Sequence, residues 1–131
     1  MSMNICIATG EYVPKAGGIA TFYHSLAKLL ARYGHKVTVL TVGKAAIEHD
    51  TGVQVVWLDE QVRKAERRVS STLPGHAPSV VRHMAVGIAM RAWMEDHAQC
   101  RAFDVVETGE FGGSSVFLTD LGLPPLAVTC H

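Results

Sequence analysis

Two glycines, Gly17 and Gly18, stand between a short apolar run and a segment with helical periodicity. The N-terminus of a helix leaves backbone N–H groups unpaired and carries roughly half a positive charge. Glycines at such a point let a ligand approach the backbone closely, because they carry no side chain. The pair therefore predicts a loop that could hold a phosphate or a sugar hydroxyl. Taken alone, however, a glycine pair is as often simple turn chemistry.

Further polar and glycine residues follow two later apolar runs. Glu107, Glu110 and Gly112 come at or after the end of the first of these runs, and His131 follows the second. Individually, such a glutamate is more often a solvated or helix-capping carboxylate, and such a histidine more often a hydrogen-bonded structural residue. Together these residues favour a ligand-binding or catalytic site.

These residues are positioned by an alternation of predicted strands and helices. Apolar runs predict strands at 3–9, 37–42, 53–58, 104–108 and 126–130. Helices are predicted at 19–33, 61–69, 79–98 and 112–120, with loops between them. The alternation predicts an α/β fold, a Rossmann-like parallel sheet with helices on both faces, in a single domain spanning 1–131.

In such a sheet, ligands bind outside the carboxyl ends of the strands. The polar and glycine residues gather at those ends, which share one rim whatever the strand order. We therefore predict His131 as catalytic and the following residues as substrate-binding: Gly17, Gly18, Glu107, Glu110 and Gly112.

The helices carry patterns that predict which side chains are buried. In the first helix the predicted buried stripe comprises Ile19, Phe22, Tyr23, Leu26, Leu30 and Tyr33. Gly34 is predicted to follow the helix end as a C′ glycine. Ser79 is predicted to be the N-cap of the long helix. Its core-facing stripe is predicted from four apolar pairs: Val80/Val81, Met84/Ala85, Ile88/Ala89 and Ala92/Trp93.

Composition excludes several classes of protein. Hydrophobic residues make up 48% of the 131 residues, enough for a sizeable core, while 12 basic and 12 acidic side chains cancel. A neutral chain is a poor candidate for nucleic-acid binding by phosphate neutralisation. Cys6, Cys100 and Cys130 are predicted to be reduced, mostly buried thiols of a cytoplasmic protein. We find neither a signal peptide nor a stretch of ~20 apolar residues.

Several sequence motifs are absent. No G-x-G-x-x-G directly follows the first strand, and no P-loop or G-x-S-x-G elbow occurs. The seven histidines form neither H-E-x-x-H nor H-x-H, so we expect no metal site.

The sequence resembles the N-terminal domain of retaining glycosyltransferases of the GT-B fold, family four. The resemblance covers nearly the whole chain. It is carried by the Gly17-Gly18-Ile19 loop, by the return L-x-x-x-G-H-x-V-T-V-L-T at 30–41, by Phe103-Asp104-Val105-Val106-Glu107, and by the closing P-x-x-V-T-x-H at 125–131.

The resemblance implies transfer of a hexose, with retention, from a UDP- or GDP-sugar to a sugar or lipid-linked acceptor, as in polysaccharide biosynthesis. It implies that the N-terminal domain mainly binds the acceptor, that the glycine loop lies near the donor's phosphates, and that His131 lies near the transferred sugar. It implies no cofactor and no metal, because helix N-termini and positive groups stabilise the leaving diphosphate.

The donor-binding C-terminal domain of this family has no counterpart in the chain. We therefore expect an incomplete, acceptor-side GT-B half, inactive by itself and prone to self-association through the open edge of its last strand. In that strand, Leu126, Ala127 and Val128 are predicted to be buried on both faces.

A short basic run offers a further partner. Arg63, Lys64, Arg67 and Arg68 could contact anionic headgroups at the inner membrane face, although such a run is more often a solvated helix face.

Two other functions compete with sugar transfer. The main alternative is a non-catalytic Rossmann-like binding or regulatory module. A flavodoxin-like receiver domain is disfavoured, since no acidic cluster follows the first strand.

Overall fold

The computed structural model describes residues 1–12, 17–43, 52–96, 103–110, 113, 115–119 and 123–130. Five strands form one sheet in the order β3-β2-β1-β4-β5, and every pair is parallel. Their bounds are β1 Asn4–Ala8, β2 Lys36–Thr41, β3 Val53–Trp57, β4 Val105–Gly109 and β5 Leu126–Thr129. The predicted α/β parallel sheet is confirmed.

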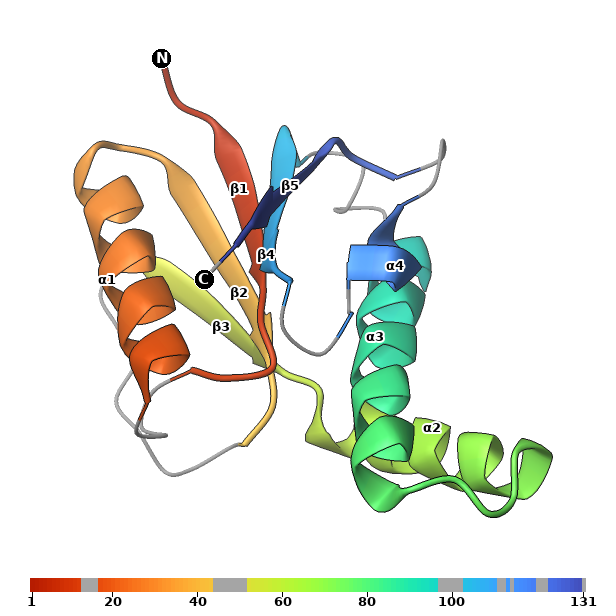
Figure 1. Cartoon of the computed structure of the whole chain (residues 1–131). Coiled ribbons are helices and arrows are strands. Elements are labelled where there is room, and N and C mark those ends of the chain that lie inside the picture. The colour runs from red at the N-terminus through yellow and green to blue at the C-terminus, as the bar shows by residue number, and fades with distance from the viewer. Residues whose placement is uncertain are drawn as a thin grey trace.

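Helices cover both faces of the sheet, as predicted. Their bounds are α1 Gly18–Arg32, α2 Asp59–Thr72, α3 Pro78–Asp96 and α4 Ser115–Leu118. Figure 1 shows α1 on one side of the sheet and α2, α3 and α4 on the other. Each side has its own hydrophobic core, because alternate strand residues point to opposite faces. Ile7 and Val39 meet Tyr23 of α1. Cys6 and Leu40 belong to the core completed by α2, α3 and α4.

The first helix ends as predicted but is rotated from the predicted orientation. Gly34 has φ of +88°, and the amides of Gly34 and His35 donate to Ala31 O and Leu30 O, which is a Schellman C-cap. Phe22 and Tyr33, by contrast, are 39% and 74% exposed, so the prediction that they are buried is wrong. Small residues explain the rotation. Ala20 and Ala27 are fully buried with Tyr23, so the alanine side of α1 lies closest to the sheet.

Helices α2 and α3 also differ from expectation. The structure extends α2 at both ends of the predicted 61–69. The predicted N-cap Ser79 is wrong, because Ala77 O accepts from the amides of Val80 and Val81, which makes Pro78 the first helical residue. Proline suits that position, since its missing N–H would have no partner there and its φ is already helical.

The buried surface of α3 is broader than the predicted stripe. Val81, Ala85 and Ala89 are buried as expected, but Val80 is 44% exposed. A second row of buried residues, absent from the prediction, consists of Val86, Met90 and Met94. These residues are buried because α3 packs against α2 and α4 as well as against the strand residues of the same core.

At the edge of the sheet, β5 departs from the prediction of a strand buried on both faces. Val128 is 45% exposed, and the other three residues of β5 are only partly buried. Cys130 is exposed as well, whereas Cys6 is buried, so the prediction of mostly buried thiols fails at Cys130. Cys100 lies outside the described residues. Within the described ranges, no helix combines the length and apolar character that a membrane crossing requires.

Candidate functional site

The carboxyl ends of all five strands lie on one rim of the sheet, because every pair is parallel. In the order β3-β2-β1-β4-β5, strands β2 and β3 are added on one side of β1, and strands β4 and β5 are added on the other side. The direction of strand addition therefore reverses between β1 and β4. Open α/β sheets bind ligands at such a switch point, beyond the carboxyl ends of the two central strands. The candidate site is therefore the rim formed by the segments after β1 and β4 and by the start of α1, hereafter the carboxyl rim.

The glycine pair occupies the start of α1 on this rim. Gly17 is the N-cap residue with φ of +150°, and its carbonyl accepts from the amide of Thr21 at 3.1 Å and from Thr21 Oγ1 at 2.9 Å. As a glycine, Gly17 supplies no side-chain capping hydrogen bond of its own. A Cβ on Gly17 would meet Glu11 Oε2 at 3.5 Å, whereas a Cβ on Gly18 would have no atom of the described residues within 4 Å. Gly17 thus serves the backbone turn, and Gly18 leaves open space beside the first helical amides.

The segment after β1 is folded tightly back toward α1. Thr9 Oγ1 donates to Glu11 O at 2.9 Å and accepts from the Glu11 amide at 3.2 Å. Tyr12 is only 2% exposed, and its ring meets the ring of His24 on α1 edge to face, with centroids 5.8 Å apart. Sequence analysis missed Tyr12 and His24. An aromatic residue between the first strand and the first helix was the available signal for the packed Tyr12.

Glu107 is joined to the neighbouring strand. Its Oε1 accepts a hydrogen bond from Thr129 Oγ1 on β5. Burial, and secondarily the negative charge of Glu107, raise the pKa of Tyr23 well above its ordinary value, so this carboxylate acts on the buried phenol of α1. The side chain of Glu107 therefore joins β4 to β5.

Glu110 lies beyond the end of β4 and is exposed. Its amide donates to Thr129 O at 3.2 Å, and its carbonyl accepts from the Gly113 amide at 3.1 Å. The backbone of Glu110 is thus tied to the end of β5 while its side chain remains accessible on the carboxyl rim. The other two predicted site residues, Gly112 and His131, lie outside the described residues.

Two hollows lie away from the carboxyl rim. One is at the amino ends of the strands and is lined partly by Asn4, His35, Lys36 and Gln54. The other lies along α2, beside Arg63, Arg67 and Ser70. Among the described residues, no three His, Cys, Asp or Glu side chains gather in a way that could hold a metal ion.

The fold and rim define a Rossmann-like α/β domain, and two solved structures of Phytolacca americana UGT2 share this fold. The apo structure has a TM-score of 0.56 and 20% identity, covering 95% of this chain and 29% of that one. The structure complexed with UDP-2fluoro-glucose and pterostilbene has a TM-score of 0.56 and 21% identity, covering 98% and 31%. The chain thus spans about three tenths of the length of these structures.

Sequence comparison gives the family. Residues 4–106 match the starch synthase catalytic domain, and the chain belongs to this glycosyltransferase family. No curated protein matches the chain. The fold is that of one Rossmann-like half of a GT-B glycosyltransferase, as the resemblance implied.

Proposed function

We propose that this chain is the acceptor-side part of a glycosyltransferase of the family-four type. It would move a hexose from a UDP- or GDP-sugar to a sugar or lipid-linked acceptor, with retention of anomeric configuration and without a cofactor or metal. The observation that carries the proposal is the Gly17-Gly18 start of α1, where a Cβ on Gly18 meets no atom of the described residues within 4 Å, in a chain that matches a glycosyltransferase family over residues 4–106.

In this proposal the parts of the carboxyl rim have different roles. The first amides of α1 point toward the donor's phosphates, where their partial positive charge stabilises the leaving diphosphate. Glu110 presents an exposed carboxylate that can accept hydrogen bonds from acceptor hydroxyls. His131, which follows β5, acts beside the transferred sugar. Glu107 binds substrate less directly than predicted from sequence, because one of its oxygens already accepts from Thr129.

The test uses the full-length protein, meaning the longest translated product that contains this chain. UDP-glucose and GDP-mannose are supplied with a panel of sugar and lipid-linked acceptors, and released nucleoside diphosphate is measured with and without EDTA. We expect release that depends on the acceptor and survives EDTA, and NMR of the product then gives its anomeric configuration. Saturable binding of these ligands without turnover would instead favour the binding or regulatory module.

We also propose that the protein is cytoplasmic and lies at the inner membrane face, and one observation favours the membrane contact. In the described part of the chain no ion pair engages Arg63, Arg67 or Arg68, whereas Lys64 pairs with Glu60 at 3.7 Å. The exposed turn that follows these arginines is flanked by Leu73, which is 38% exposed. Cations on a helix that ends at an exposed apolar side chain suit an anionic bilayer surface, at ~1 kcal/mol per basic residue.

Co-sedimentation with vesicles tests this location. We expect binding to vesicles of phosphatidylglycerol and phosphatidylcholine that weakens with added salt and is lost in an Arg63→Gln, Arg67→Gln, Arg68→Gln variant. Equal binding to pure phosphatidylcholine vesicles would show that anionic headgroups are not recognised.

A further inference from the structure

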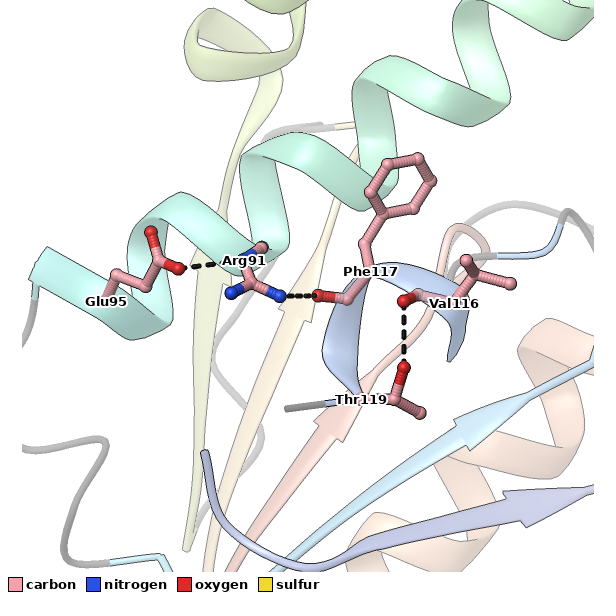
Figure 2. Close-up of polar contacts among 5 residues, drawn as sticks. All are labelled: Arg91, Glu95, Val116, Phe117 and Thr119. Atoms are coloured by element: carbon pink, nitrogen blue, oxygen red, sulfur yellow. Dashed lines mark hydrogen bonds and ion pairs between the residues drawn. The ribbon is translucent and has the colours of Figure 1, made fainter. Parts of the chain in front are cut away.

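Helix α4 cannot be stable by itself. It has four residues, Ser115–Leu118, and isolated helices shorter than about 12 residues are marginal in water. Tertiary contacts must therefore hold it in place, and most of them come from α3, with fewer from β5. Figure 2 shows the two helices, with the side chain of Arg91 on α3 reaching toward the end of α4.

The first contact is a notch in α3. Gly87 is buried, and a Cβ built on it would lie 2.3 Å from Phe117 Cδ2. The ring of Phe117 therefore occupies space that any side chain at position 87 would take. The next residue, Leu118, is 2% exposed and belongs to the core on this side of the sheet. Apolar packing of Phe117 and Leu118 thus holds α4 against α3 and the core.

The second contact is polar and directional. Arg91 Nη1 donates to Phe117 O at 3.2 Å, and Arg91 Nε donates to Glu95 Oε1 at 2.7 Å (Figure 2). The carbonyls at the end of a helix have no partner within the helix, and a charged donor satisfies one of them well. Thr119 Oγ1 donates to a second such carbonyl, Val116 O, at 3.0 Å. Glu95 holds the guanidinium in the orientation that reaches α4.

Helix α4 begins close to Glu110 of the carboxyl rim. The Glu110 amide donates to Thr129 O of β5, and the Glu110 carbonyl accepts from the amide of Gly113. Gly113 lies two residues before Ser115, the first residue of α4. A shift of α4 along α3 would therefore move Gly113 and disturb the hydrogen bond to the Glu110 carbonyl.

We propose that Arg91 is a positioning residue for the acceptor. Through the carbonyl of Phe117 it fixes α4, and α4 in turn holds Gly113, whose amide donates to the Glu110 carbonyl and so keeps Glu110 in the orientation that binds acceptor hydroxyls. This inference rests on the proposed function. It assigns Arg91 no contact with substrate and no part in the chemical step.

The test compares three variants with a matched control in the full-length protein. Arg91→Met keeps much of the side-chain stem and removes the guanidinium. Glu95→Gln weakens the hydrogen bond that orients the guanidinium of Arg91. In Arg91→Lys the single ammonium group can reach only one of the two acceptors, Phe117 O or Glu95 Oε1. Arg32→Met removes an arginine from the exposed last turn of α1 and serves as control. Amide hydrogen exchange over 115–119 and steady-state kinetics are both measured.

For Arg91→Met we expect protection over 115–119 to fall about tenfold, because a hydrogen bond from a charged donor is lost. We expect the acceptor KM to rise about tenfold, with kcat within about twofold and an unchanged donor KM. Arg91→Lys and Glu95→Gln should lie between this variant and the wild type, and Arg32→Met should match the wild type.

Unchanged exchange over 115–119 would overturn the docking role of Arg91. Increased exchange with an unchanged acceptor KM would overturn the positioning role and leave a purely structural contact. If the wild type transfers no sugar from any donor, the proposed function fails and the acceptor part of this inference fails with it. The exchange data then still decide whether Arg91 holds α4.

Discussion

Whether Gly87→Ala stabilises or destabilises the fold depends on a single neighbouring side chain, that of Phe117. Alanine is favoured over glycine inside a helix by ~1 kcal/mol, so at an unobstructed position the change would stabilise the chain. At position 87 the new Cβ would approach Phe117 Cδ2, Cε2 and Cγ to 2.3, 2.9 and 2.9 Å. Real Cβ atoms do not reach such distances, so either the ring or the helices must move.

The magnitude follows from two opposing contributions. Forcing extra atoms into a packed site costs ~1–3 kcal/mol, against the ~1 kcal/mol gain in helix propensity. We therefore expect Gly87→Ala to destabilise the chain by ~1 kcal/mol. In a Phe117→Ala background the obstruction is gone, and the same substitution should stabilise by ~1 kcal/mol. The two backgrounds thus differ by ~2 kcal/mol, which is the coupling between Gly87 and Phe117.

Urea unfolding of the four proteins of this double-mutant cycle measures the coupling, with an unchanged m-value as the check on two-state behaviour. Ala92→Gly, at an exposed position of the same helix, calibrates the helix-propensity contribution and should destabilise by ~1 kcal/mol. If Gly87→Ala is stabilising in both backgrounds, Phe117 does not occupy the notch and the reasoning about α4 docking is refuted.

Four further predictions concern the rim, the first helix and the isolated chain. Gly18→Val in the full-length protein should leave the melting temperature nearly unchanged, because a Cβ there meets nothing within 4 Å, but should lower kcat/KM for transfer; undiminished kcat/KM would contradict a ligand at these amides. His131→Ala should lower kcat with little change in melting temperature, whereas a large loss of stability with normal activity would assign it a structural role. Gly34→Ala should destabilise by ~1–2 kcal/mol in urea unfolding, since its φ of +88° disfavours any Cβ although the space is open. The 131-residue chain alone should transfer no sugar and should form concentration-dependent oligomers in sedimentation, because the edge strand β5 exposes Val128; a clean monomer with transferase activity would refute this.

Much of the fold could be predicted because its signals are local. Continuous apolar runs gave strand positions that agree with the structure to within about one residue at most ends, since a strand buried on both faces needs no partner to be recognised. Gly34 could be identified as the residue after the helix end because a left-handed backbone conformation favours glycine. Parallel alternation then required the carboxyl ends of the strands to share a rim.

The errors arose where burial depends on distant residues. Phe22 and Tyr33 fit the helical periodicity of apolar residues in α1. When apolar residues lie on more than one side of a helix, however, this periodicity does not show which side faces the sheet. Only the close approach permitted by Ala20 and Ala27 decides the rotation. Likewise, Val128 is apolar like the residues of the central strands, but the strand order leaves β5 at the edge.

By itself the sequence determined the α/β class, the positions of the strands and the glycine-led start of α1, because these follow from short-range periodicity and backbone chirality. The tertiary structure alone decided that Glu107 is engaged by Thr129, that Tyr12 packs against His24, and that Arg91 reaches the end of α4. Each of these contacts joins different parts of the fold. Their formation depends on strand order and helix placement, which no local pattern of residues encodes.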